Sequence, residues 1–157
     1  MSHSCTSNLK LHRNQLKQLL SAEPVKYSDW KPNEINNTHE LSLKSGVYHF
    51  FEELENGDIE SLYVGMGGFS ENGRNLYERL KQHFQVNGDG LLKKYSKYGY
   101  LSSSAMKNDL VARNVYFQWL PLHKKEPNLT LNLVTCNRKI ILCEHFCISI
   151  LDPKFND

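Results

Sequence analysis

An arginine and a histidine on one predicted helix are the first residues whose types and spacing suggest chemistry. Arg79 and His83 stand four residues apart in NLYERLKQHF, so they share one face of a helix over residues 75 to 84. Leu76 and Leu80 border that face, which puts Arg79 at the edge of the core with its guanidinium directed to one end of a sheet. A guanidinium held there suits bidentate binding of a phosphate, which a lysine could not imitate.

A glutamate in an apolar helix is the second such feature. The last predicted helix, RKIILCEHFCISIL, is apolar almost throughout but carries Glu144 in its middle. An unpaired buried carboxylate is costly, so Glu144 needs a partner. One candidate is a divalent cation, which takes a carboxylate together with waters and a phosphate oxygen. The other is an ion pair with Arg79. Near the end of the chain, Asn156 could hold Tyr63, Glu144 or a phosphate by hydrogen bonds.

Two tyrosines next to glycines flank a predicted hairpin. They stand in GVY (residues 46–48) and YVG (residues 63–65), on either side of the pair Asn56-Gly57. Asparagine-glycine between apolar-rich runs is typical of a two-residue type I′ turn. The cross-strand pairs that follow are Glu55 with Asp58, Phe50 with Tyr63, and Tyr48 with Gly65. Because paired residues share a face, we expect Tyr48, Phe50 and Tyr63 to project from one side, where ordinary aromatic packing is the simplest explanation.

Basic residues are concentrated in the second half of the chain, although the net charge is only +2. Residues 93 to 125 carry seven lysines or arginines against one acid, whereas residues 40 to 60 carry six acids against one lysine. Within the basic stretch, KKYSKYGY interleaves lysines with tyrosines, a composition suited to phosphate contacts and to stacking on bases. A solvated helix end explains the same residues equally well. The candidate nucleic-acid contacts here are Lys93, Lys94, Lys97 and Tyr98.

Length and composition indicate one domain over residues 1–157, which is long enough to bury a core without disulfide or metal staples. No apolar run approaches the roughly 20 residues of a membrane span, so we expect no membrane partner. The first 20 residues lack the apolar core of a signal peptide, which indicates a cytoplasmic protein. Cys143 and Cys147 could join Cys136 and His145 in a zinc site, but cysteines on an apolar helix are more often small core residues.

These side chains are expected on a small α+β fold, with a three-stranded, mainly antiparallel sheet flanked by helices. Residues 1–44 are predicted to form a helix and an irregular arm, and residues 45–157 the core with an insertion at about 88–110. The predicted helices begin at Ser7, near Leu91, and at Thr135 or Asn137. The first ends near Ser21, and the last ends at Asp152-Pro153. The third strand is predicted over residues 110–122, stopping near Pro121.

Taken in order, these residues resemble the GIY-YIG nucleases. The phrases at 46–48 and 63–65 look like the two that name the family, and Arg79 matches the arginine on its first helix. CEHFCISILDPKFN is similar to the family's closing pattern, a helical glutamate followed by a proline and an asparagine. The similarity extends from Gly46 to Asn156. Each phrase alone is weak, but five in order with suitable spacing form a specific signature.

Two features resemble the restriction-endonuclease branch of that family. One is the histidine four residues after Arg79, and the other is the extra sequence wrapped around the module. The chain departs from the family at Met66, where many members have a lysine or a similar polar residue. Lys81 is a candidate source of the missing positive charge.

The resemblance implies a DNA endonuclease that hydrolyses phosphodiester bonds with Mg²⁺ or Mn²⁺. Glu144 would hold the metal, Arg79 would stabilise the transition state, and Tyr48 would relay the proton of the attacking water. Tyr63 would orient this water or act as the base itself, and Asn156 would brace the site. Since a phenol with its ordinary pKa of about 10 is a poor base at neutral pH, we expect Arg79, the metal and His83 to lower the pKa of Tyr48.

The resemblance also implies duplex DNA as the partner and sequence-specific cleavage of the restriction type. A homodimer, or paired encounters, would supply two sites of opposite polarity for a palindromic target. Base recognition is expected in residues 24–44 and 88–110, since only added elements can reach base edges. The alternatives are a structure-specific or nonspecific nuclease, acting in repair or recombination or on RNA, and a non-catalytic binding module. Such a module would be expected to lose Arg79 or Glu144, and both are present.

Overall fold

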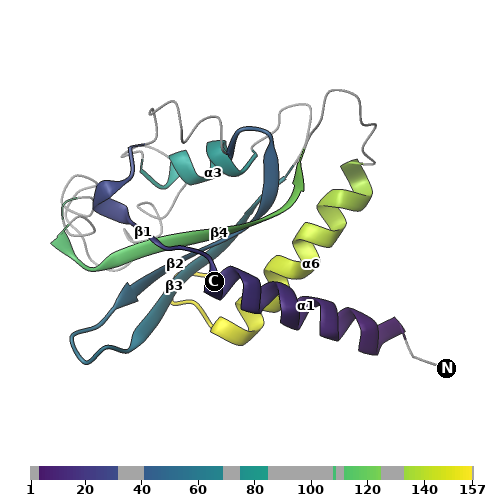
Figure 1. Cartoon of the computed structure of the whole chain (residues 1–157), viewed down its shortest axis with the longest axis horizontal. Coiled ribbons are helices and arrows are strands. Elements are labelled where there is room, and N and C mark those ends of the chain that lie inside the picture. The colour runs from purple at the N-terminus through teal and green to yellow at the C-terminus, as the bar shows by residue number, and fades with distance from the viewer. Residues whose placement is uncertain are drawn as a thin grey trace.

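A four-stranded antiparallel sheet with helices on both faces forms the frame of the protein (Figure 1). The computed structural model describes residues 4–31, 41–68, 75–84, 108, 112–124 and 133–156, without the side chains of residues 4–6 and 133–134. In chain order, the elements are α1 (Ser4–Ser21), β1 (Val25–Lys26), the 3₁₀ turn η1 (Tyr27–Asp29), β2 (Lys44–Glu53), β3 (Ile59–Gly67), α3 (Leu76–Gln82), β4 (Val115–Lys124) and α6 (Leu133–Leu151). None of the helices in these ranges combines the length and the apolar character of a membrane span.

The strands lie in the order β1-β4-β2-β3, and each neighbouring pair is antiparallel. The α+β class is therefore confirmed, but the predicted number of three strands is wrong. The additional strand is β1, which pairs with Tyr116 and Phe117 of β4 and lies in the region predicted to be an irregular arm. Two residues are too few to show an alternating pattern, so periodicity could not reveal this strand.

The central register of the β2–β3 hairpin is as predicted, with Tyr48 opposite Gly65 and Phe50 opposite Tyr63. The predicted turn is wrong. The amide of Leu54 donates to the carbonyl of Asp58 at 2.8 Å, so the loop has three residues, and of these only Gly57 has positive φ, at 85°. This is a type I turn closed by a glycine bulge. A second bulge between Phe50 and Phe51 restores the predicted register farther along the strands.

Different elements cover the two faces of the sheet (Figure 1). Tyr48, Phe50 and Tyr63 project from one face, as predicted, into an aromatic core that η1 and α3 cover. The opposite face carries Val47 and Val64 and packs against α1 and α6. The alternation of side chains along β2 therefore separates an aromatic layer from an aliphatic one.

Part of the predicted arm over residues 24–44 belongs to the core. Tyr27 and Trp30 are buried, and the ring of Tyr27 stacks on Phe84 with its centroid 4.2 Å away. Leu41 is also buried, whereas residues 32–40 lie outside the described residues. The described part of the arm thus turns its aromatic side chains inward, which does not suit the predicted role in contacting base edges.

The predicted stripe of the central helix is confirmed, because Leu76, Leu80 and Phe84 are all buried. Asn75 caps this helix, with its Oδ1 accepting a hydrogen bond from the amide of Glu78 at 3.1 Å.

Two predicted helix starts are wrong. α1 begins at Ser4, before Ser7, and α6 begins at Leu133, before Thr135 and Asn137. Residues that can cap a helix also occur within helices, so their presence alone does not define a boundary. The predicted end of the last helix is confirmed, since α6 ends at Leu151, directly before Asp152-Pro153.

The strand β4 begins later and extends farther than predicted, from Val115 through Pro121 to Lys124. Its register against β2 shifts from Pro121 opposite Gly46 to His123 opposite Ser45, so Leu122 is an extra residue in a bulge. A bulge interrupts the ladder and therefore accommodates the missing N–H of proline. The predicted insertion at 88–110 and its short helix lie outside the described residues, apart from residue 108.

Candidate catalytic site

Tyr48 lies at the centre of a cluster of the predicted site residues. Its side chain is fully buried on the aromatic face of β2, and its phenol lies directly over Gly65 of β3. A Cβ at position 65 would overlap the phenol ring and its hydroxyl. The glycine of the second phrase therefore provides the space that the tyrosine of the first phrase occupies, as the paired register predicts.

His83 is the hydrogen-bond partner of Tyr48. The Tyr48 hydroxyl and His83 Nε2 are 2.8 Å apart, and both side chains are buried. The imidazole also packs against two other rings, with centroids 5.2 Å from Tyr63 and 4.8 Å from Phe50. His83 therefore faces both tyrosines. The spacing from Arg79 predicted only that these two residues share one face of the helix.

A third tyrosine, Tyr27, fixes the position of His83. The Tyr27 hydroxyl donates to the backbone carbonyl of His83 at 2.8 Å. His83 follows the last residue of α3, where helix carbonyls need partners outside the helix. Sequence reasoning missed Tyr27, because it lies in a segment without periodicity and 56 residues before its partner.

Arg79 lies at the end of β3 beside the two tyrosines, as predicted. Its Nε donates to the carbonyl of Met66 at 3.3 Å, and its Nη1 donates to Gln82 Oε1 at 3.2 Å. The side chain is half-buried. Its positive charge lowers the pKa of both Tyr48 and Tyr63, which shows that the guanidinium and the phenols are close.

Glu144 of α6 acts electrostatically on the same cluster. It is half-buried, and its negative charge raises the pKa of Tyr48 and Tyr63. No three His, Cys, Asp or Glu side chains within the described ranges gather into a metal cage, so the zinc alternative gains no support there. Cys143 and Cys147 instead pack in the aliphatic core. A single carboxylate is nevertheless compatible with Mg²⁺, which keeps several waters and binds substrate phosphate.

Burial has the largest effect on the pKa of both Tyr48 and Tyr63. It raises the pKa of Tyr48 above its ordinary value of 10, and Tyr63 and Glu144 raise that pKa further, while Arg79 lowers it through its charge and a hydrogen bond. Burial likewise raises the pKa of Tyr63. The expected lowering of the Tyr48 pKa by Arg79 is therefore present, but in the protein alone it does not offset the cost of burying a phenolate, and the net shift is upward.

Asn156 binds the strand of Tyr63 rather than the phenols. Its Oδ1 accepts from the amide of Val64 at 2.7 Å, and its Nδ2 donates to the Val64 carbonyl at 2.8 Å. The amide of Phe155 donates to the carbonyl of Leu62 at 2.9 Å, so the C-terminal segment extends the same edge. Asn156 thus supports β3 next to Tyr63. Its side-chain amide binds the backbone of Val64, and not the side chains of Tyr63 or Glu144 that were predicted as partners.

The predicted nucleic-acid contacts are described only in part. Lys81 is half-buried, and its Nζ lies 5.7 Å from the centroid of the Tyr77 ring on the same helix. Lys93, Lys94, Lys97 and Tyr98 lie outside the described residues. The cluster that the structure brings together therefore consists of Tyr48, Tyr63, Arg79, His83 and Glu144.

No protein-family model, curated protein or solved structure matches this chain.

Proposed function

We propose that this protein is a metal-dependent DNA endonuclease of the GIY-YIG type that hydrolyses phosphodiester bonds. The observation that carries this proposal is the buried hydrogen bond between Tyr48 and His83, made within electrostatic reach of Arg79, Tyr63 and Glu144. Phenol, imidazole, guanidinium and carboxylate groups from β2, β3, α3 and α6 converge there. Together they offer a proton relay, a phosphate ligand and a metal ligand, which are the parts that this hydrolysis requires.

The Tyr48–His83 pair suits proton transfer better than a lone phenol would. Since burial raises the pKa of Tyr48, a free phenolate is a rare species at neutral pH. With His83 Nε2 as acceptor, Tyr48 passes its own proton to the imidazole as it takes the proton of the attacking water. The positive charge then rests on His83, and the phenol remains neutral. Tyr63, whose ring centroid lies 6.2 Å from that of Tyr48, would orient the water or serve as the base itself.

Arg79 and Glu144 have complementary roles in this proposal. The Arg79 guanidinium, held by Met66 and Gln82, supplies fixed positive charge to the phosphorane-like transition state. Glu144 is the residue that would hold Mg²⁺ or Mn²⁺, whose chemistry there is to polarise the phosphate and stabilise the 3′ leaving oxygen. Glu144 also raises the pKa of both phenols, so neutralising this carboxylate removes one obstacle to the release of a proton.

We further propose that the cleavage is sequence-specific and that its substrate is duplex DNA. The basic aromatic sequence around residues 93–100 supports a nucleic-acid substrate through its charge and stacking groups. The experiment is digestion of mixed plasmid and phage DNA with Mg²⁺, followed by sequencing of the ends. Discrete fragments that share a short palindrome are the expected result. A smear without a shared motif would contradict specificity, and cutting only at branches or nicks would indicate a repair enzyme.

A further inference from the structure

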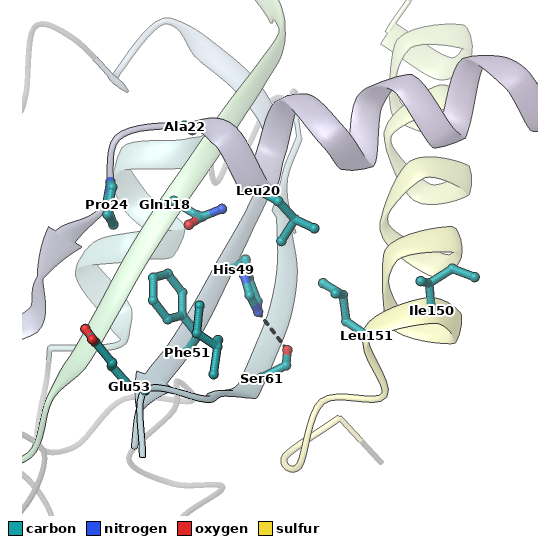
Figure 2. A pocket seen from close by; sticks show the side chains of 12 residues that line it. Leu20, Ala22, Pro24, His49, Phe51, Glu53, Ser61, Gln118, Ile150 and Leu151 are labelled. Atoms are coloured by element: carbon teal, nitrogen blue, oxygen red, sulfur yellow. Dashed lines mark hydrogen bonds between the residues drawn. The ribbon is translucent and has the colours of Figure 1, made fainter. Parts of the chain in front are cut away.

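The face of the sheet opposite Tyr48 contains a pocket of about 650 Å³ (Figure 2). The ends of α1 and α6 form its walls, with Leu20 on one side and Ile150 and Leu151 on the other. Phe51 and Gln118 line it from the sheet. Such a volume falls in the usual range of sites for small organic molecules, and a mostly apolar lining with few polar groups is typical of them.

A serine–histidine pair contributes two of the polar side chains that line the pocket. His49 of β2 and Ser61 of β3 both line the pocket, and His49 Nε2 and Ser61 Oγ are 2.7 Å apart (Figure 2). The imidazole is 2% exposed, and its Nδ1 has no hydrogen-bond partner among the described residues. A buried polar atom without a partner is uncommon in folded proteins, and a water or a bound molecule in the pocket would supply one. Gln118, which also lines the pocket, makes its hydrogen bond elsewhere, from its Nε2 to the carbonyl of Leu19.

The charges around the pocket restrict its occupant. Glu53 lines the pocket, and the hairpin loop next to it carries the further acids Glu55 and Asp58. These carboxylates disfavour anions, including nucleic acid, and favour neutral or cationic molecules. The rim is apolar as well, since the side chains of Leu20, Ile59 and Ile150 are 47%, 63% and 59% exposed. A small occupant would cover part of this surface without requiring a second protein.

We propose that this pocket binds a small neutral or cationic molecule with an apolar ring body and one hydrogen-bonding group that engages the Ser61–His49 pair. The serine hydroxyl can donate or accept, depending on which way the bond to His49 Nε2 is polarised, so the pair suits either kind of group. The apolar body lies between Leu20 and Leu151, over Phe51. This site is separate from the proposed nuclease centre, whose tyrosines lie on the other face of the sheet, and it does not depend on that function.

The probe for this proposal is prodan, a neutral naphthalene with a single ketone acceptor whose emission shifts to the blue in apolar surroundings. We expect saturable binding with one molecule per chain. Leu20→Asp, at an exposed position of the wall, should abolish the blue shift, whereas Leu9→Asp on the same helix should leave it unchanged, because Leu9 is 41% exposed and lies away from the pocket lining. Ser61→Ala should weaken binding about tenfold, which corresponds to one lost hydrogen bond.

Three results would overturn this proposal. They are emission that does not saturate, equal affinity for Leu20→Asp and wild type, and conversion of a dimer to a monomer by Leu20→Asp in sedimentation. The last result would mean that a second copy of the chain covers the surface. The comparison of Leu20→Asp with Leu9→Asp decides the outcome even if Ser61→Ala fails to fold. Glu144→Gln should bind prodan as wild type does, so failure of the nuclease proposal would leave this measurement unaffected.

Discussion

At the scale of single residues, the hydroxyl of Tyr48 is the group whose loss is most informative. Tyr48→Phe removes the relay but keeps the ring over Gly65, so we expect cleavage to fall by about 10²- to 10⁴-fold. The free energy of unfolding should fall by only about 1–3 kcal/mol, the cost of an unpaired His83 Nε2. Single-turnover cleavage and urea unfolding measure the two effects. Tyr116→Phe, at a half-buried tyrosine of β4, is the control. Equal cleavage rates for the two variants would exclude Tyr48 from the chemistry.

The burial of His49 leads to a prediction about how the free energy of unfolding depends on pH. Burial lowers the pKa of His49 to about 4, whereas in the unfolded chain it is about 6.5. The unfolded state therefore binds the proton first as the pH falls. Stability from this group is fully present above pH 6.5 and is lost toward pH 4, by up to about 3 kcal/mol. Urea unfolding of wild type and His49→Gln should show a smaller loss in the variant. Parallel pH profiles would contradict a buried neutral imidazole.

At the scale of elements, the close approach of β2 and β3 at Gly65 makes the site possible. Gly65→Ala places a Cβ against the phenol of Tyr48, so we expect a loss of about 1–3 kcal/mol in stability together with a loss of cleavage. Gly57→Ala is a matched control in the same hairpin. Its φ of 85° makes the change costly, by about 1 kcal/mol, but apart from the two chain neighbours no atom of the described residues lies within 4 Å of the new Cβ. Cleavage retained by both variants would show that Tyr48 need not hold this position.

The elements also show which parts of the site the sequence could predict. The alternation along the strands was sufficient to place Tyr48, Phe50 and Tyr63 on one face, and the helical period placed Arg79 and His83 together. The predicted pairing of these strands holds only because the bulge between Phe50 and Phe51 offsets the three-residue loop, which the turn signal did not predict. The bond from Tyr27 to His83 was not predictable, because it joins an aperiodic segment to a helix end. The upward shift in the pKa of Tyr48 was not predictable either, because it depends on how deeply the folded protein buries the phenol.

At the scale of the whole molecule, the proposed DNA contacts should come from the basic stretch around residues 93–100. Replacing Lys93, Lys94 and Lys97 together with alanine should weaken DNA binding and make the slope of log affinity against log salt less steep by up to about 3, because each phosphate contact releases counterions. Fluorescence anisotropy on a DNA duplex at several salt concentrations gives the slope. An unchanged slope would assign these lysines to a solvated surface.

The metal-dependent cleavage of DNA is the central claim, and Glu144→Gln tests it most directly. The change removes the proposed metal ligand but keeps the size of the side chain, so the variant should fold and bind DNA as wild type does. We expect single-turnover cleavage of a supercoiled plasmid with Mg²⁺ to disappear in Glu144→Gln. It should persist in His145→Gln, at the exposed next position of the same helix. Cleavage by Glu144→Gln at the wild-type rate would contradict the proposed function of the site.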